Sequence, residues 1–246
     1  MRLTRVFVDA RLEPGARVTL PSDAASHLTR VLRLGEGDAC TLFDGRGGEY
    51  AARIASAGRR EVTVQVGAHD PTERESPLRL VLLQGLARGE RMDLIVQKAT
   101  ELGAAAIRPV HTEHSGVRLD ERQSTRKRDH WRGIAVAACE QCGRNRLPEI
   151  LEPLSLDDAL SAAPTGLRLT LSLDLPPAAL AREALASAGA ITLLVGPEGG
   201  LAASEERLAA SHGFQALRLG PRVLRTETAA LAALAMLQGL GGDGLE

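Results

Sequence analysis

The sequence predicts an α/β fold in two domains, with a β-rich first part and a parallel sheet flanked by helices in the second. Short apolar runs with turn residues between them fill residues 1–70, whereas strand-like and helix-like segments alternate from residue 78 onward. Residues 191–195 (ITLLV) are an apolar run too short for most helices, which is typical of a strand buried on both faces of a parallel sheet. The length of 246 residues allows one large or two modest domains.

Residues 21–34 are the helical exception in the β-rich first part. Within this segment His27, Arg30 and Arg33 recur at three-residue spacing, which places their side chains near one face of a helix. A solvated surface is the ordinary explanation of such a charged face, and a binding surface is the alternative.

A polar stretch separates the two parts. Residues 71–77 (PTERESP) contain two prolines and no apolar periodicity, so we predict a linker there. In the second part we expect strands near residues 78–85, 106–110, 167–173, 191–195 and 214–219. We expect helices near residues 92–102, 134–142, 153–163, 178–188, 205–212 and 226–240.

Two glycine-containing loops follow predicted strands of this sheet. Residues 196–200 (GPEGG) come after the strand at 191–195, and Gly220-Pro221 comes after the strand at 214–219. Ligands of open α/β sheets bind beyond the carboxyl ends of the strands, so both loops are expected on the binding edge. They lack the Gly-x-Gly-x-x-Gly spacing and the Gly-Lys-Ser/Thr of nucleotide-binding loops. On their own they are consistent with tight turns or with a ligand site.

The charge and composition exclude some classes of nucleic-acid-binding protein. The formal net charge is −1, so any nucleic-acid surface must be a local basic patch. Aromatic residues make up 2% of the chain, which argues against a surface built on base stacking. Residues 119–132 are strongly charged, and their basic residues outnumber the nearby acids. They contain Arg122, Arg126, Lys127, Arg128 and Arg132.

Targeting and metal signals are weak in this sequence. We find no secretory signal pattern and no apolar run long enough to span a membrane, so a cytoplasmic protein is expected. His111-Thr-Glu-His114 brings two histidines and a carboxylate together. No neighbouring segment completes a zinc ligand set, and we expect no bound metal.

Several long motifs occur in order along the chain. LLVGPEGG and LGPRVLRTETAALAAL, in the last quarter, closely resemble the SPOUT class of RNA methyltransferases. Within that class the chain resembles the RsmE family, the 16S rRNA uracil-N3 methyltransferases. HLTRVLR, LFDGRGGEY, GERMDLIVQKATELG and CEQCGR match the same family. The resemblance covers nearly the whole sequence.

This resemblance implies a specific architecture. A PUA-like β-barrel that binds RNA is expected over residues 1–70, the linker over 71–77, and a SPOUT methyltransferase domain over 78–246. The second domain would be an α/β-knot, which is a trefoil-knotted parallel sheet with helices on both faces, and the knot would lie at about 191–238. General topology rules disfavour knots, so this expectation comes from the family alone. A homodimer is implied as well.

The resemblance also implies that the chain binds S-adenosylmethionine and methylates N3 of a uridine in the assembled small ribosomal subunit, the decoding-region uridine 1498 of 16S rRNA. The implied cofactor residues are Leu171, Ser172, Leu173, Leu194, Gly196, Gly199, Gly200, Leu217, Leu219, Gly220, Val223 and Leu224. The candidate RNA contacts are His27, Arg30, Arg33, Arg88, Lys98, Arg144 and Arg146. For Lys98 the residues alone favour an ordinary surface position.

The chemistry at N3 suggests the catalytic residues. N3 of uracil carries a proton, so the site needs a base that accepts it or a cation that stabilises the resulting anion. Arg225 is the candidate cation, and Glu198 and Glu227 are candidate bases or orienting residues. A structural ion pair between Arg225 and Glu227 is the alternative. The rival functions are a non-catalytic rRNA-binding or assembly factor and a nucleotide-dependent oxidoreductase.

Overall fold

The computed structural model describes residues 4–58, 61–172, 177–178 and 180–244, and its contacts divide the chain into two units. The first unit comprises Met1–Glu75 and Val136–Leu147. The second unit comprises Ser76–Ala135 and Pro148–Glu246.

The first unit is built on a five-stranded sheet in the order β1-β3-β4-β5-β2. Its strands are β1 (Arg5–Phe7), β2 (Arg17–Thr19), β3 (Ala39–Phe43), β4 (Glu49–Ala57) and β5 (Val62–Asp70). β1 and β3 pair in parallel, and the other neighbours are antiparallel. Val62, Val64 and Val66 of β5 are buried because alternate residues of a strand face the same side, here the core formed with Leu42 and Ile54. The predicted β-rich first domain is confirmed.

The helix expected at residues 21–34 is shorter than predicted and partly of another type. A short α1 (Ser22–Ser26) continues into the π-helical turn η1 (His27–Val31). Arg33 follows the helix with a positive φ of 56°. The expectation that His27, Arg30 and Arg33 share one face assumed an α-helix throughout. The helical segment ends at Val31, so this spacing does not apply to Arg33.

The contact-based division differs from the predicted linear boundaries for one segment, because residues 136–147 group with the first unit. The guanidinium of Arg144 is buried there and donates to both carboxylate oxygens of Glu75, at 3.0 and 2.6 Å. Arg5 Nη2 donates to the carbonyl of Arg144 at 3.1 Å and to Asn145 Oδ1 at 2.6 Å. Buried charges need such partners, and these partners are distant in sequence, so no local pattern reveals them.

The second unit contains a sheet in the order β12-β10-β11-β6-β7-β8, and β9 also pairs with β7. Its strands are β6 (Leu80–Gly85), β7 (Ala104–His111), β8 (Glu149–Ile150), β9 (Leu154–Ser155), β10 (Leu167–Thr170), β11 (Ile191–Val195) and β12 (Gln215–Ala216). All of these pairings are parallel. The parallel sheet expected for this part is confirmed, and β11 is buried along its whole length.

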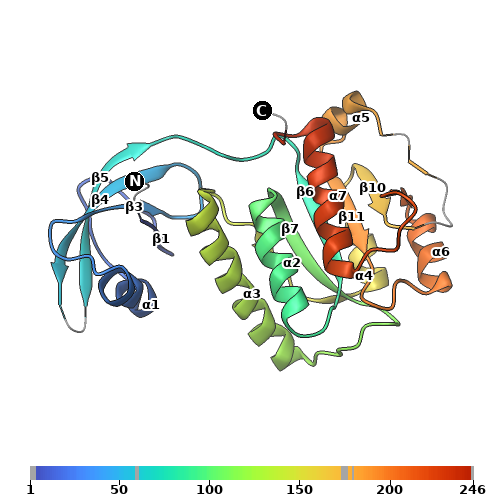
Figure 1. Cartoon of the computed structure of the whole chain (residues 1–246), viewed down its shortest axis with the longest axis horizontal. Helices are drawn as coiled ribbons and strands as arrows, with labels where there is room; N and C mark the ends of the chain where they lie inside the picture. Colours follow the sequence, from blue (N-terminus) through green and yellow to red (C-terminus); the bar gives the residue numbers. More distant parts are fainter. Residues whose placement is uncertain (1–3, 59–60, 173–176, 179, 245–246) are drawn as a thin grey trace. The chain divides into compact units, whose positions relative to one another are not determined.

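Helices cover both faces of this sheet, as predicted. They are α2 (Glu90–Glu101), α3 (Glu121–Cys142), α4 (Leu156–Ser161), α5 (Arg182–Ser187), α6 (Ala203–Ser211) and α7 (Thr226–Gly241). α2 and α7 lie side by side (Figure 1) and share one core with Leu80 and Leu82 of β6. α4 and α6 pack on the other face with Val81 and Leu83. Neighbouring residues of one strand therefore point into different cores.

Two elements differ from the sequence prediction in ways that affect the site. β12 ends at Ala216, so residues 217–220 form a loop instead of the end of a strand. α3 begins at Glu121, well before the Ala-rich segment from which it was predicted. Within the part of the chain that the structure describes, no helix combines the length and apolar character needed to cross a membrane. The trefoil knot stays a prediction.

Candidate functional site

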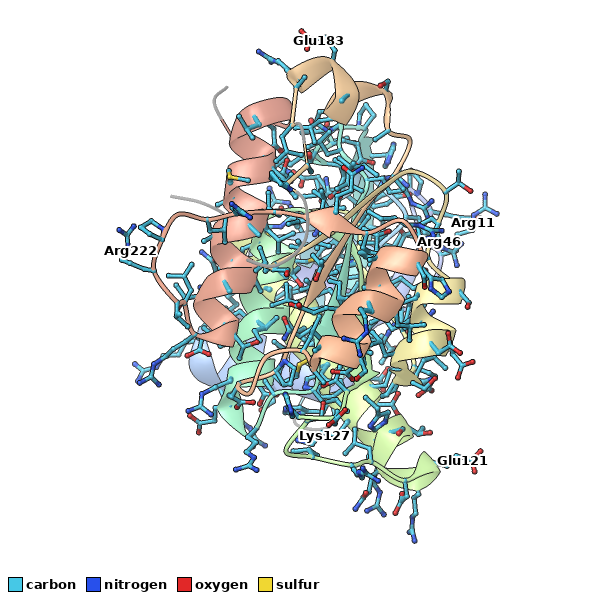
Figure 2. All side chains as sticks on the ribbon, turned by 90° about the vertical axis from the view of Figure 1, so that its right-hand side faces the viewer. Arg11, Arg46, Glu121, Lys127, Glu183 and Arg222 are labelled. Carbon is cyan, nitrogen blue, oxygen red and sulfur yellow. The ribbon has the colours of Figure 1, made fainter. Side chains whose placement is uncertain are left out.

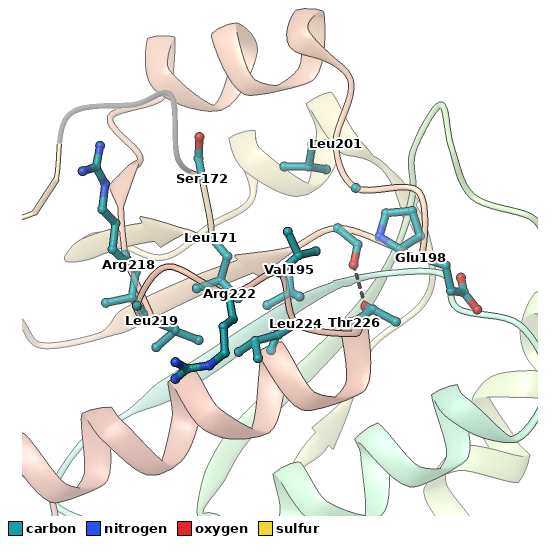
Figure 3. Close-up of a pocket in the computed structure, with 17 residues that line it drawn as sticks. Leu171, Ser172, Val195, Glu198, Leu201, Arg218, Leu219, Arg222, Leu224 and Thr226 are labelled. Atoms are coloured by element: carbon teal, nitrogen blue, oxygen red, sulfur yellow. Dashed lines mark hydrogen bonds between the residues drawn. The ribbon is translucent and has the colours of Figure 1, made fainter.

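Loops at the carboxyl ends of β10, β11 and β12 enclose a cavity of about 240 Å³ (Figure 3). Its walls come from residues 171–172, from the glycine-rich loop after β11, from the loop after β12, and from the start of α7. Leu171, Leu219 and Leu224 supply apolar side chains, and the loops supply backbone polar groups. Such a mixture is typical of small-molecule sites.

A buried threonine ties the start of α7 to the glycine-rich loop. Thr226 Oγ1 donates to the carbonyl oxygen of Gly196 at 2.6 Å, as the dashed line in Figure 3 shows. Gln84 Nε2, at the end of β6, donates to Thr226 Oγ1 at 3.0 Å. A Cβ on Gly196 would lie 2.9 Å from the backbone of Gly200, so only glycine fits there.

Most of the predicted cofactor residues line this cavity. They are Leu171, Ser172, Gly196, Gly200, Leu217, Leu219, Gly220, Val223 and Leu224. Leu194 is fully buried beneath the loop, and Leu173 lies outside the described residues. Gly199 does not line the cavity, and a Cβ there would lie 2.8 Å from His114 Cβ. His114 therefore occupies the space beside Gly199.

A carboxylate stands at one end of the cavity. Glu198 Oε1 accepts a hydrogen bond from Arg91 Nη1 at 2.8 Å and another from the backbone N–H of Arg88 at 3.0 Å. Partial burial would raise the pKa of Glu198, but these hydrogen bonds outweigh burial and lower it. A carboxylate with a lowered pKa is a weak proton acceptor at neutral pH, so the geometry favours an orienting role.

Arg91 also faces the second candidate carboxylate. Its Nε lies 3.9 Å from Glu227 Oε2, and this oxygen is buried without a hydrogen bond to any described residue. The side chain of Arg225 is exposed and makes no hydrogen bond or ion pair with a described residue. The alternative of an Arg225–Glu227 ion pair is therefore wrong in this structure, where the partner is Arg91.

Sequence reasoning missed Arg91 as a site residue. The available signal was its place in the first turn of the helix that follows β6, at the same sheet edge as the glycine-rich loop.

The loop after β7 supports the glycine-rich loop from outside the cavity. His114 Nδ1 lies 3.0 Å from the carbonyl oxygen of Gly199 and 3.3 Å from that of Gly200. Glu205 accepts hydrogen bonds from the backbone N–H groups of Glu113 at 2.8 Å and Ala202 at 2.9 Å. His114 thus contacts the glycine-rich loop, which the sequence did not indicate.

The candidate RNA residues have different surroundings. Arg30, Arg33 and Arg88 are exposed, and the side chain of His27 lies outside the description. Lys98 pairs with Glu101 at 2.8 Å. Arg146 is half exposed and pairs with Glu73 at 3.1 Å.

Arg144 cannot serve as the RNA contact that was predicted. Its guanidinium is buried and bound to Glu75 in the first unit. Hydrogen bonds to Glu75 raise the pKa of Arg144 although burial alone would lower it. The charge is therefore already neutralised inside the protein.

Two family models match successive parts of the chain. Residues 74–238 match a family described as "RNA methyltransferase domain", and residues 20–67 match "RNA methyltransferase PUA domain". The Ribosomal RNA small subunit methyltransferase E of Synechocystis sp. is 34% identical over 92% of this chain and 74% of its own length. The protein of that name from Bacillus subtilis is 29% identical over 96% of both chains.

Solved structures give the same result. The Ribosomal RNA small subunit methyltransferase E of Neisseria gonorrhoeae, bound to S-adenosyl methionine, is 38% identical with a TM-score of 0.91. The alignment covers 98% of this chain and 99% of that one. A probable rRNA-methyltransferase from Porphyromonas gingivalis is 27% identical over 97% and 98% of the two chains, with a TM-score of 0.81.

Proposed function

Because this chain belongs to the family of Ribosomal RNA small subunit methyltransferase E, we propose that it methylates N3 of a uridine in 16S rRNA with S-adenosylmethionine. The observation that carries the proposal is the cavity at the sheet edge, which is bounded by the loops expected from the sequence. We further propose uridine 1498 in the assembled small subunit as the target.

The residues around the cavity fit the cofactor. Leu171, Leu219 and Leu224 give an apolar surface suited to a purine ring, and the backbone of Gly196 and Gly220 lies at the edge where polar groups of a nucleoside need partners. When bound, S-adenosylmethionine supplies an electrophilic methyl group. The loops hold this part of the site rigidly because Thr226 ties two of them together.

The protein's own task is to make N3 of the uracil reactive. Loss of the N3 proton places negative charge on the ring, and a nearby cation stabilises it. Arg225 suits this role because it is exposed at the start of α7, next to the cavity-lining Leu224, and is not engaged by any described carboxylate. Glu227, with an oxygen that lacks a hydrogen bond, is the better proton acceptor of the two carboxylates. Glu198 orients Arg91.

The apolar surface of the second unit supports a homodimer. Val223 is 93% exposed, and Leu94 of α2 and Leu240 of α7 are each about 40% exposed. α2 and α7 are neighbours, and Ala232, Ala235 and Met236 of α7 are not fully buried. Apolar side chains in solvent favour burial in a symmetric interface. Light scattering at micromolar concentration should give twice the monomer mass of 26.0 kDa.

The test of function is methyl transfer to purified small subunits that lack the modification. Labelled S-adenosylmethionine should transfer one methyl group per subunit, and mapping should find it at N3 of a single uridine. Binding to subunits without transfer would support the assembly-factor alternative and overturn the proposal.

A further inference from the structure

A second hollow of about 310 Å³ lies at the start of α3, outside the methyl-transfer site. It is lined by Leu119, Gln123, Arg126, Lys127 and His130, all in the second unit. We refer to this set as the α3 groove. Arg118 and Arg122 precede Arg126 at four-residue intervals along the chain.

The cations of this segment divide into paired and unpaired groups. Arg128 pairs with Asp129 and Glu152, which are its acidic neighbours. By contrast, the exposed side chains of Arg118, Arg122, Arg126 and Lys127 form no hydrogen bond or ion pair with any residue that the structure describes. This is a local concentration of uncompensated positive charge in a protein whose net charge is −1.

Asp120 and Glu121 form no ion pair with the cations of the groove among the residues that the structure describes. Asp120 Oδ1 accepts from the backbone N–H of Gln123 at 2.7 Å, and Gln123 Oε1 accepts from that of Asp120 at 3.0 Å. This reciprocal cap fixes the start of α3. At 100° per residue, Glu121 lies on the face opposite Gln123. In Figure 2 the side chains of Glu121 and Lys127 lie on different sides of the helix.

The α3 groove connects directly to the methyl-transfer site through the first turn of α2. Asp93 accepts hydrogen bonds from Trp131 Nε1 and His130 Nε2, each at 3.0 Å. Two residues earlier, Arg91 binds Glu198 at the end of the cavity. One turn of one helix therefore contacts both the groove and the cavity.

A second connection runs through the loop before α3. His114 is within hydrogen-bonding distance of the glycine-rich loop, and four residues later the chain reaches Arg118. The loop that contacts the glycine-rich loop therefore leads along the chain into the basic segment at the start of α3.

We propose that the α3 groove binds the phosphodiester backbone of 16S rRNA beside the target uridine, an inference that rests on the proposed function. Arginine and lysine without acidic partners suit phosphate oxygens. The groove contains no phenylalanine, tyrosine or tryptophan among its lining residues, so phosphate contact accounts for it better than base stacking. Its contribution is to hold the RNA in register, without a role in the chemical step.

The test neutralises the groove in the full-length protein. The double variant Arg126→Gln, Lys127→Gln is compared with Arg79→Gln, Arg182→Gln, which removes two exposed arginines, one just before β6 and one at the start of α5. Each lost phosphate contact reduces the slope of log affinity against log salt by roughly 0.7–0.9. For binding to rRNA or small subunits, we expect the slope of log affinity against log salt to be smaller by about 1.5 in the groove variant than in the parent. The slope of the control variant should equal that of the parent.

Kinetics separate this role from chemistry and from misfolding. The groove variant should raise the KM for subunits several-fold and leave kcat at saturating subunits and the affinity for S-adenosylmethionine unchanged. The charge-preserving variant Arg126→Lys, Lys127→Arg should keep the parental salt slope. Salt slopes equal in parent, groove variant and control would overturn the proposal.

A protein partner is the competing occupant. A change of oligomeric mass in the groove variant, with parental rRNA binding, would make the groove a protein interface and also overturn the proposal. Because binding to rRNA is measured without methyl transfer, failure of the proposed function and failure of the groove remain distinguishable.

Discussion

Arg91 Nη1 donates a hydrogen bond to Glu198 Oε1 at 2.8 Å, from the first turn of α2 to the glycine-rich loop. The same guanidinium approaches Glu227, with 3.9 Å between Nε and Oε2. One arginine therefore sets the positions of both candidate carboxylates.

Replacement of Arg91 by alanine should reduce methyl transfer far more than stability. The Arg91–Glu198 pair is partly exposed, and ion pairs at the surface stabilise proteins by about 0.2–1 kcal/mol. We expect Tm to fall by less than about 4 °C and kcat to fall at least tenfold, because Glu198 and Glu227 lose their common partner. Arg91→Lys is the matched control and should recover part of kcat. A parental kcat in Arg91→Ala would show that the contacts of Arg91 with Glu198 and Glu227 have no catalytic role.

The lowered pKa of Glu198 predicts a defined dependence of stability on pH. A carboxylate whose pKa is lower in the folded state than in the unfolded state stabilises the fold when the pH is above its pKa in the unfolded state. This contribution is lost as the pH falls through the folded pKa, which lies below the ordinary 4.5. The free-energy difference between the parent and Glu198→Gln should therefore be constant from pH 8 to about 5 and shrink below about 4.5. Denaturant titrations at several pH values measure it, and a difference that grows on acidification would contradict the assignment.

The parts of the fold that the sequence predicted are those with local periodic signals. The helix expected near residues 92–102 is α2, whose Met92, Ile95 and Val96 are buried, and β11 is the fully buried strand that its composition indicated. These patterns depend on residues two to four apart, so they can be read from a single segment.

The parts that could not be predicted depend on distant partners. Arg144 has a surface-like composition around it, yet Glu75 and Arg5 hold it in the interior. Gly199 fits a ligand loop by composition, but His114 from another loop fills the space beside it. Neither relation leaves a periodic signal, because the residues concerned are brought together only by the tertiary fold.

The contact between Gly199 and His114 gives a reciprocal prediction. Gly199→Ala places a Cβ 2.8 Å from His114 Cβ, which forces the loop after β7 away from the glycine-rich loop. We expect affinity for S-adenosylmethionine to fall several-fold by calorimetry. His114→Gly removes the clash. Adding Gly199→Ala to the His114→Gly variant should therefore reduce the affinity for S-adenosylmethionine less than adding it to the parent. If Gly199→Ala binds S-adenosylmethionine with the parental affinity, the loop after β7 can move aside without weakening cofactor binding, which would contradict this prediction.

Thr226 should be important for both stability and cofactor binding. Thr226→Val keeps the side-chain shape but removes the donor to Gly196 and the acceptor for Gln84. Gln84 Nε2 also donates to the carbonyls of Gly85 at 3.0 Å and Gly196 at 3.4 Å. We therefore expect a loss near the lower end of the about 1–3 kcal/mol that unsatisfied buried polar groups cost, which denaturant unfolding can measure. Thr226→Ser keeps the hydroxyl and should retain most of the stability. Equal stability of the valine variant and the parent would mean that other groups satisfy the carbonyl of Gly196.

Arg225 provides the most direct test of the chemistry. Its side chain is exposed and has no partner among the described residues, so Arg225→Ala should leave folding and affinity for S-adenosylmethionine unchanged. If Arg225 stabilises the uracil anion, kcat should fall by about 10²–10³, as expected when one stabilising donor is removed. Turnover of the variant should rise with pH more steeply than that of the parent, because more uracil is already deprotonated. Arg225→Lys keeps a positive charge, so its kcat should lie between that of the parent and that of Arg225→Ala. Single-turnover methyl transfer with saturating cofactor and subunits isolates this step, and an Arg225→Ala rate equal to the parental rate would remove Arg225 from the mechanism.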